Sequence, residues 1–269
     1  MTPGEKDLAS AVTPGAAAPS GAAPSSGEED LRSQPLDARG RSLDVLVTGS
    51  SSGIGRATAE LFCARGHSVW GLDVAGPSVS HPRYRHVEAD VRDAAALRAL
   101  AAGLRPQVVV ANAGVQGTPD DIDVNLKGAI NTCEAFAFEP GGRRPTAEVA
   151  AVVLVGSSSG HTGAEFPAYA ASKGGVLAYA RNLAQRLVPG ATCNSVDPGG
   201  VLTELNRPVT DDPELWSRVM ALTPLRRWAT PGEIAEWVYF VAVTNRFMTG
   251  QNLLVDGGEA GSFDFVWPE

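Results

Sequence analysis

Few cysteines and no long apolar run occur in the sequence, and both absences exclude classes of protein. The three cysteines, Cys63, Cys133 and Cys193, lie far apart, and each belongs to an apolar stretch. Their spacing fits neither a disulfide framework nor a zinc site, so we expect buried thiols and no metal. No apolar run approaches the ~18–20 residues of a membrane-spanning helix. Because no secretory signal is visible either, we expect a cytoplasmic protein.

Basic residues are fewer than acidic ones. The chain has 22 Lys and Arg against 30 Asp and Glu, which gives a net charge of −8 at pH 7. Nucleic acids and anionic membranes are bound by dense clusters of basic side chains, and the sequence contains no such cluster. We therefore expect a small-molecule partner, and neither nucleic acid nor membrane.

The composition divides the chain into two unequal regions. Residues 1–40 are rich in Ala, Pro, Gly and Ser. Such a segment cannot bury enough apolar surface to offset the entropy of ordering, so it is predicted to be a disordered extension. The remaining residues, 41–269, are predicted to form the folded part of the chain, whose length allows one or two domains.

From residue 42 onward, short apolar runs alternate with helical patterns. The predicted strands cover Asp44–Thr48, Ser68–Leu72, His86–Val91, Gln107–Ala111, Ala150–Val155, Thr192–Val196 and Gln251–Val255. The predicted helices cover Arg56–Arg65, Ala94–Gly103, Ile122–Phe138, a segment through Tyr169 to about Leu187, and one that begins at the capping box Thr230–Glu233. This alternation predicts an α/β fold, a doubly wound parallel sheet of about seven strands with helices on both faces.

Glycines and one acidic residue follow the first two predicted strands. Gly49, Gly53 and Gly55 form a turn that opens the first helix, and Asp73 ends the second strand. Backbone N–H groups in such a turn approach a pyrophosphate, and an acid in that place accepts hydrogen bonds from ribose hydroxyls. The alternative is an ordinary tight turn without a ligand. Because the Asp73 carboxylate repels a 2′-phosphate, it predicts NAD(H) over NADP(H), with Arg56 as the nearest competing base.

Polar residues stand where the predicted strands end. In a parallel sheet these ends lie at one edge, and open α/β sheets bind their ligands there. The polar residues at this edge are Gly49 to Gly55, Asp73, Asp90, Asn112, Ser157 and Asp197–Pro198. Their coincidence predicts a single ligand site.

Tyr169 and Lys173 form a candidate acid/base pair. Their four-residue separation places them one turn apart on the same face of a helix. A nearby ammonium favours phenolate and lowers a tyrosine pKa toward working pH. The spacing alone is weak evidence, because it recurs by chance in many helices, and its weight comes from the patterns on either side.

Six motifs between Leu43 and Gly258 resemble, in order, those of the short-chain dehydrogenases/reductases, a family with a single-domain Rossmann fold. The motifs are Thr48–Gly55, Asn112–Gly114, Asn125, Ser157, Tyr169 with Lys173, and Pro198–Gly199 with Thr203. A looser similarity is to the 3α-hydroxysteroid dehydrogenase/carbonyl reductase and dihydrodiol dehydrogenase branches. The resemblance implies an oxidoreductase that uses a nicotinamide cofactor.

The resemblance implies four catalytic residues. Tyr169 would exchange a proton with the substrate oxygen, and Lys173 would lower the pKa of Tyr169 and hold the nicotinamide ribose. Ser157 would hydrogen-bond the substrate oxygen. Asn125 would kink its helix and hold a water that links Lys173 to solvent.

The identity of the catalytic serine stays open between Ser157, Ser158 and Ser159. The family's usual spacing from the tyrosine falls on Gly156, and aligning the preceding strand favours Ser157. His161 lies nearby and is either an exposed loop residue or a substrate contact.

The resemblance also implies the cofactor contacts. The residues are Gly49, Ser52, Gly53, Ile54, Gly55, Asp73, Asp90, Val91, Asn112, Ala113, Gly114, Tyr169, Lys173, Pro198, Gly199, Val201 and Thr203. Within this set, Asp90 and Val91 would flank the adenine, and Val201 and Thr203 would contact the nicotinamide carboxamide.

Two features depart from the family pattern. Asn125 follows Asn112 by only thirteen residues, in a region that often helps subunits pair. A homo-dimer or homo-tetramer is nevertheless expected. The tail Phe263–Glu269 extends past the usual end, and its aromatic side chains are candidates to cover a substrate pocket or a neighbouring subunit.

The segment Glu204–Thr223 is predicted to be a mobile lid. It has more apolar than basic residues, which favours a cyclic or aromatic, moderately apolar secondary alcohol or ketone. The predicted function is NAD(H)-dependent interconversion of such an alcohol and its ketone. The alternative is a catalytically silent NAD-binding regulatory or scaffold protein, which has no chemical reason to keep the four catalytic residues together.

Overall fold

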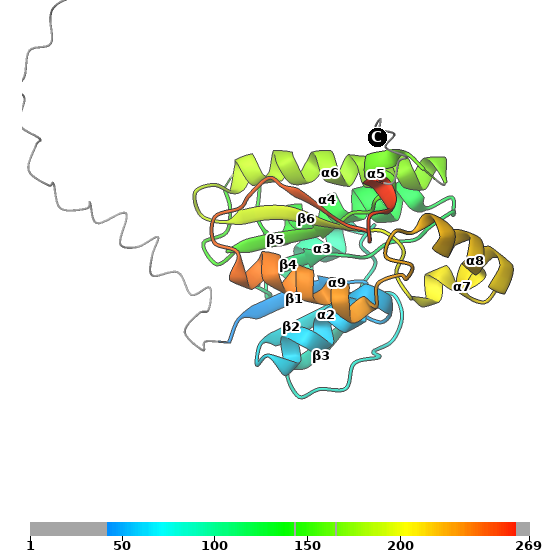
Figure 1. Cartoon of the computed structure of the whole chain (residues 1–269). Helices are drawn as coiled ribbons and strands as arrows, with labels where there is room; N and C mark the ends of the chain where they lie inside the picture. Colours follow the sequence, from blue (N-terminus) through cyan, green and yellow to red (C-terminus); the bar gives the residue numbers. More distant parts are fainter. Residues whose placement is uncertain (1–41, 143, 165, 262–269) are drawn as a thin grey trace, which may run out of the picture. The chain divides into compact units, whose positions relative to one another are not determined.

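The computed structural model describes residues 42–261, apart from Arg143 and Glu165 (Figure 1). The predicted disordered extension, 1–40, and the aromatic tail, Phe263–Glu269, lie outside the described residues. Both expectations therefore stay predictions.

One parallel sheet of seven strands organises the described part of the chain, as predicted. Its order is β3-β2-β1-β4-β5-β6-β7, so the chain starts near the middle and winds to each edge in turn. The strands are β1 (Asp44–Thr48), β2 (Ser68–Asp73), β3 (Tyr84–Glu88), β4 (Val108–Ala111), β5 (Ala151–Val155), β6 (Thr192–Pro198) and β7 (Asn252–Val255). The order reverses between β1 and β4, where ligands bind in doubly wound sheets.

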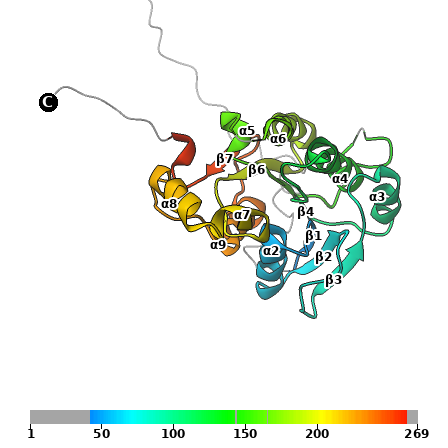
Figure 2. The ribbon, with the colours of Figure 1, turned by 90° about the vertical axis from the view of Figure 1, so that its right-hand side faces the viewer.

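Helices cover both faces of this sheet (Figure 2). One face packs against α3 (Ala94–Ala101), α4 (Gly128–Phe136) and α6 (Pro167–Leu187), and the other against α2 (Gly53–Ala64) and α9 (Pro231–Tyr239). Leu46 and Leu154 point to the first face and Val45 and Val153 to the second, as strand alternation requires. Each fully buried side chain of this size contributes about 1.5–3 kcal/mol, so the two apolar layers hold the helices in place.

Strand β3 begins and ends earlier than predicted. It covers Tyr84–Glu88 rather than His86–Val91. The carboxylate of Asp90 accepts a 2.9 Å hydrogen bond from the N–H of Arg92, which turns the chain away from the sheet. The last pair of the β2–β3 ladder is therefore Asp73 with Glu88.

The predicted helix Ile122–Phe138 is two helices of different kind. Its first part is the π-helix η1 (Ile122–Lys127), and the N–H of Gly128 donates to the carbonyl of Asp123, five residues back. The second part is α4. π-turns occur often at functional sites, and this one contains Asn125.

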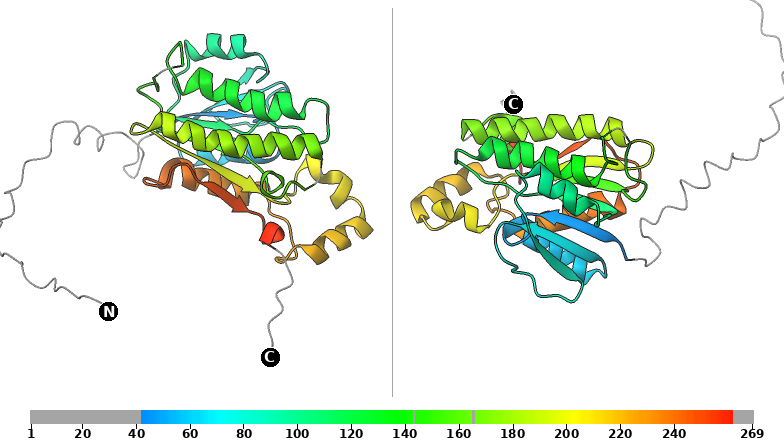
Figure 3. Two further views of the ribbon diagram at one scale, coloured as in Figure 1. Left: turned by 90° about the horizontal axis from the view of Figure 1, so that it is seen from above. Right: turned by 180° about the vertical axis from the view of Figure 1, so that it is seen from behind.

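Short helices gather at the carboxyl end of the sheet (Figures 1 and 3). They are α5 (Ser159–Thr162), η2 (Glu204–Asn206), α7 (Arg207–Thr210), α8 (Pro213–Leu222) and η4 (Glu259–Gly261), while the π-helix η3 (Phe240–Thr244) continues α9. The segment predicted as a lid corresponds to η2, α7 and α8. The predicted capping box is present, since Thr230 and Glu233 exchange their hydrogen bonds at the start of α9. Among residues 42–261, no helix is both long and apolar enough to cross a membrane.

Candidate active site

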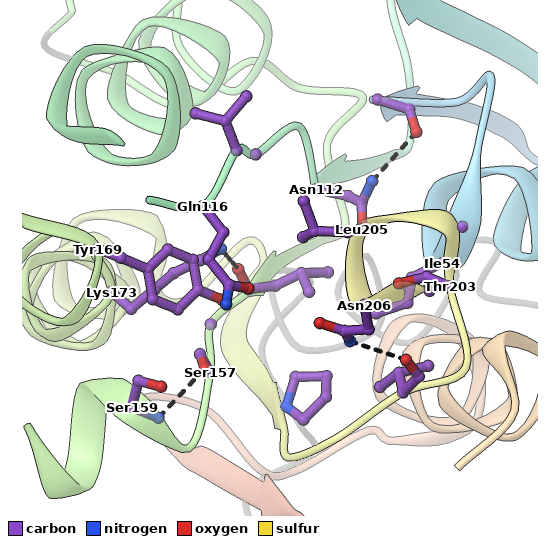
Figure 4. A pocket seen from close by; sticks show the side chains of 18 of the residues that line it. Ile54, Asn112, Gln116, Ser157, Ser159, Tyr169, Lys173, Thr203, Leu205 and Asn206 are labelled. Atoms are coloured by element: carbon purple, nitrogen blue, oxygen red, sulfur yellow. Dashed lines mark hydrogen bonds between the residues drawn. The ribbon is translucent and has the colours of Figure 1, made fainter. Parts of the chain in front are cut away.

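A cavity of about 870 Å³ lies at the carboxyl ends of β1, β2, β4, β5 and β6 (Figure 4). Every residue to which the resemblance assigns a catalytic or cofactor-binding role lines this cavity except Gly55 and Asn125, and Asp197, which was predicted at the same edge, does not line it either. The structure thus brings together residues that are more than a hundred positions apart in the chain. A cavity of several hundred Å³ with a few polar side chains is typical of small-molecule sites.

The glycine turn after β1 is fixed by contacts with the end of β4. Gly49 has a φ of +67°, and a Cβ on it would lie 2.8 Å from the Cα of Ala113. Only glycine fits this position without moving the neighbouring strand. The side-chain amide of Asn112 donates to the carbonyls of Thr48 (2.9 Å) and Gly49 (3.3 Å). Gly55 is buried beneath the turn, where it allows α2 to approach, and does not reach the cavity.

Asp73 lies beside this turn at the end of β2. Its two carboxylate oxygens accept 2.9 Å hydrogen bonds from the N–H groups of Ser51 and Ala75. These bonds hold the carboxylate at the cavity wall, and each oxygen keeps a lone pair for a further donor. A pair of ribose hydroxyls supplies donors of the right kind.

Arg92 and Lys173 are the basic residues among the described residues that line the cavity. The Arg92 guanidinium pairs with Asp90 at 2.7 Å and with Asp120 at 3.3 Å. The hydrogen bonds that Arg92 donates to Asp90 lower the pKa of the Asp90 carboxyl. This arginine is therefore already paired with two carboxylates. Arg56, the competing base, does not line the cavity and lies 3.9 Å from Glu204.

Tyr169 and Lys173 lie on the first two turns of α6, which Pro167 opens. The Lys173 ammonium is 5.8 Å from the centre of the Tyr169 ring and donates a 2.9 Å hydrogen bond to the carbonyl of Val155. Lys173 is only 5 % exposed. Burial lowers the pKa of Lys173 to about 8, and the carboxylates of Asp197 and Asp121 oppose that shift. Lys173 can therefore gain or lose a proton near neutral pH.

Asn125 is buried behind the cavity wall. Its Oδ1 accepts from the N–H of Val115 (2.8 Å), and its Nδ2 donates to the carbonyl of Val115 (2.9 Å) and to the hydroxyl of Ser172 (3.0 Å). These bonds join η1 to the strand end and to α6. Gly114 lies between the Asn125 amide and the Lys173 ammonium, since a Cβ on it would be 3.1 Å from the first and 3.6 Å from the second.

All three candidate serines line the cavity. Ser157 lies two residues after the end of β5, and its hydroxyl accepts a 3.1 Å hydrogen bond from the N–H of Ser159 (Figure 4). Because this bond leaves the Ser157 hydroxyl hydrogen free to donate, Ser157 can bind a substrate oxygen from the cavity wall. The choice of Ser157 stays a prediction.

Several cavity residues were not predicted from the sequence. Gln116 and Asn206 line the cavity with Tyr169 (Figure 4). Glu259 also lines it, and its carboxylate accepts hydrogen bonds from the Trp228 indole at 3.0 Å and from the hydroxyl of Thr223 at 2.8 Å. No local spacing marks these residues, because each comes from a different part of the chain: Gln116 from the loop after β4, Asn206 from η2 and Glu259 from η4.

His161 lies on α5, with 27 % of its side chain exposed. Its Nε2 is 2.7 Å from Oδ2 of Asp197. The side chain is therefore engaged with a buried carboxylate at the end of β6, and it does not line the cavity.

Comparisons with known proteins agree with this geometry. A family model described as enoyl-(acyl carrier protein) reductase matches residues 49–259. A Streptomyces virginiae protein assigned to the monensin polyketide synthase as a ketoacyl reductase is 34 % identical over 252 residues, which is 80 % of this chain and 95 % of that protein. The (3R)-3-hydroxyacyl-CoA dehydrogenase of Rattus norvegicus is 30 % identical over 81 % of this chain and 96 % of its own.

Among solved structures, the ligand-free aldohexose dehydrogenase of Thermoplasma acidophilum superposes with a TM-score of 0.73. It is 29 % identical and covers 86 % of this chain and 98 % of its own. The family model, the relatives and this fold agree. The chain belongs to the short-chain dehydrogenase/reductase family.

Proposed function

We propose that this protein is an NAD(H)-dependent oxidoreductase that interconverts a secondary alcohol and a ketone. The observation that supports the proposal most strongly is the buried Lys173 ammonium beside the Tyr169 ring, in the same cavity as the glycine turn. An acid/base group and a nucleotide cradle in one cavity are the two parts that such a reaction needs.

The residues present fit a nicotinamide dinucleotide. The turn at Gly49 leaves no room for a side chain and so exposes backbone N–H groups to a pyrophosphate. Asp73 offers a fixed carboxylate to the ribose hydroxyls. A 2′-phosphate would need a cation near Asp73. Among the described residues of the cavity wall none is unpaired there, because Arg92 already pairs with two carboxylates. These features favour NAD(H) over NADP(H).

The protein's own residues would handle the proton. When bound, the cofactor supplies a hydride acceptor or donor. Tyr169 would take the alcohol proton as phenolate, or return it as phenol, while the Lys173 ammonium stabilises the phenolate. Ser157 would hydrogen-bond the substrate oxygen, and Asn125 would hold the π-turn that supports Lys173.

The far end of the cavity supports a moderately apolar substrate. Lid and loop residues there are mostly apolar: Leu205, Val209, Val219, Leu222 and Trp228. Gln116 and Asn206 add polar groups without charge. A cyclic or aromatic secondary alcohol or ketone fits this wall better than a phosphorylated compound, whose charge would meet no basic side chain among the described residues of the wall. The relatives named above are also named for the oxidation or reduction of hydroxyl and carbonyl groups.

We further infer a cytoplasmic homo-dimer or homo-tetramer. Trp237 and Phe240, an edge-to-face pair on α9 and η3, are each 43 % exposed, and Leu254 of β7 is 40 % exposed. Exposed apolar side chains such as these, on the outer side of α9 and η3 and on the edge strand β7, are typical of subunit contacts. Sedimentation velocity would contradict this inference by showing a monomer at micromolar concentration.

The test is turnover of a panel of cyclic and aromatic secondary alcohols with NAD, by wild type and by Tyr169→Phe. We expect wild type to oxidise members of the panel, and Tyr169→Phe to lose at least about a hundredfold in kcat, since proton transfer contributes ~10²–10⁴-fold. NADH binding should persist in the variant, because the phenyl ring keeps its place. Retained turnover would remove Tyr169 from the mechanism. Tight NADH binding with no turnover of any carbonyl or alcohol would favour the silent scaffold.

A further inference from the structure

A carboxylate without a full set of partners lies directly beneath the catalytic residues. Asp197, near the end of β6, is 0 % exposed. Its Oδ2 is 2.7 Å from Nε2 of His161, while its Oδ1 has no hydrogen-bond partner among the described residues. A buried carboxylate in this state is costly unless it has a function or a nearby cation.

Gly156 makes room for this carboxylate. A Cβ on Gly156 would lie 2.1 Å from Oδ1 of Asp197, closer than any two such atoms can approach. The Asp197 side chain therefore occupies the volume in which a side chain at residue 156 would begin. Gly156 lies between Val155, whose carbonyl accepts from Lys173, and the candidate serine Ser157. The carboxylate thus stands next to the segment that holds both catalytic groups.

The nearby cation is Lys173. Asp197 is the leading charge that opposes the burial-driven lowering of the Lys173 pKa, and Asp121 acts in the same direction. Burial raises the pKa of Asp197, while His161, Ser195 and Lys173 oppose that shift. The groups that act on Asp197 come from α5 (His161), β6 (Ser195) and α6 (Lys173), whereas Asp121, in the loop before η1, acts on Lys173.

We propose that Asp197, held by His161, is a positioning residue that keeps the shared proton on Lys173 while Tyr169 becomes the phenolate. The proposal rests on the proposed function and adds to it two residues that do not line the cavity. Two singly deprotonated forms of the pair compete: phenolate with ammonium, and phenol with neutral amine. A negative charge close to Lys173 favours the first form, which is the one that can accept a proton from an alcohol.

The direction in which the pH of Tyr169 ionisation moves distinguishes an effect of Asp197 through Lys173 from a direct effect of Asp197 on Tyr169. Without the Asp197 charge, the first proton leaves Lys173 instead of Tyr169, so phenolate forms only at higher pH. If Asp197 acted on Tyr169 directly, removal of its charge would instead lower the pH at which phenolate forms, because a like charge would be gone.

The experiment uses four variants of the full chain. Asp197→Asn removes the charge and keeps the shape. His161→Leu removes the donor, whereas His161→Gln keeps an N–H donor in a similar place and cannot ionise. Asp44→Asn is the matched control, because Asp44 is an exposed carboxylate at the opposite end of the sheet. Thermal unfolding and NADH titration establish that each variant is folded and binds cofactor.

The readout needs no substrate. Tyrosinate absorbance is followed against pH, and the curve of the same variant with Tyr169→Phe is subtracted, which isolates Tyr169 from the other three tyrosines. We expect the Tyr169 midpoint to rise by about one pH unit in Asp197→Asn and in His161→Leu, which corresponds to about tenfold. In the double variant Asp197→Asn/His161→Leu, the Tyr169 midpoint should rise no further than in either single variant. The midpoints of His161→Gln and Asp44→Asn should match that of wild type.

With any substrate from the panel, alcohol oxidation near pH 8 should fall about tenfold in kcat in the same two variants, with KM little changed. An unchanged or lowered Tyr169 midpoint in Asp197→Asn would overturn the proposal, as would a loss in His161→Gln equal to that in His161→Leu. If wild type turns over nothing, the proposed function fails, while the tyrosinate midpoints still decide the role of Asp197.

Discussion

The Lys173 ammonium lies 5.8 Å from the centre of the Tyr169 ring, with the carbonyl of Val155 as its hydrogen-bond acceptor. This relationship follows from one turn of α6 and the end of β5. It places a cation that is 5 % exposed beside a phenol at the wall of a cofactor-sized cavity. Burial of that cation has a cost for stability as well as the catalytic use that we propose.

Replacement of Lys173 by Met should stabilise the fold at neutral pH and abolish turnover. The Lys173 pKa falls from 10.5 to about 8, which corresponds to about 3 kcal/mol against folding below pH 8. Loss of the hydrogen bond to the Val155 carbonyl should destabilise the fold by about 1 kcal/mol. We therefore expect the free energy of unfolding, measured in urea, to rise by about 2 kcal/mol.

The pH dependence gives the sign of this effect. Because the folded-state pKa of Lys173 lies below the unfolded one, the unfolded chain binds more protons between pH 8 and 10.5. Wild type should therefore gain stability relative to Lys173→Met as pH rises through that window. Lys127→Met, which removes a lysine with 64 % side-chain exposure, should show no such trend. A difference that does not change with pH would contradict the burial argument.

Substitution of Asp73 should erode the preference for NAD. Asp73→Ser removes the charge that repels a 2′-phosphate and shortens the acceptor. We expect the ratio of NADPH to NADH dissociation constants to fall at least about tenfold, since hydrogen bonds to charged groups contribute ~1.5–3 kcal/mol. Asp73→Asn separates the two effects, because it keeps one acceptor oxygen. If Asp73→Asn retains the full preference, the charge is not the cause.

Truncation of Asn125 should loosen the π-turn. Asn125→Ala breaks the bonds to Val115 and Ser172 and leaves buried polar groups unpaired, at a cost of about 2–4 kcal/mol. Ser172→Ala removes only one of these bonds and should cost about 1 kcal/mol. Chemical denaturation of both variants measures the difference. Equal and small losses would show that Asn125 does not hold this segment.

Glu259 should tie the lid to the sheet. Its carboxylate bonds to Trp228, Thr223 and the N–H of Gly200, and Trp228 packs edge-to-face on Trp216 of α8 at 5.0 Å. Glu259→Ala should raise KM about tenfold and keep kcat within about threefold of wild type. The substitution loosens the lid that forms the substrate wall, and it does not alter the residues proposed to transfer the proton. Glu236→Ala, on the exposed side of α9, serves as the control. A fall in kcat with constant KM would contradict this role.

The sequence predicts those parts of the site that depend on local spacing. The turn at Gly49, the acid Asp73 and the pair Tyr169–Lys173 each lie at the end or start of one element. A parallel sheet then brings such ends to one edge without further information. The seven-stranded sheet was predictable for the same reason, from its alternating apolar runs.

Other features depend on contacts that no local pattern records. The His161–Asp197 bond joins residues 36 positions apart, and its fit depends on an empty volume at Gly156. The family resemblance implied a kink at Asn125, but neither its form as a π-turn nor the hydrogen bond from Val115, ten residues earlier, was predicted. Strand β3 ends earlier than predicted because the Asp90 carboxylate accepts a hydrogen bond from the N–H of Arg92, which turns the chain away from the sheet. Each of these required the tertiary structure.

The central proposal is that this chain binds NAD(H) through Asp73, and that this binding does not need the hydroxyl of Tyr169. Its most direct test is a paired fluorescence titration of the purified protein with NADH and NADPH, for wild type and Tyr169→Phe, which assumes no substrate. We expect both proteins to bind NADH at least about tenfold more tightly than NADPH, a difference of ~1.4 kcal/mol. Tighter binding of NADPH would contradict the role of Asp73, and binding of neither nucleotide would contradict the dehydrogenase itself.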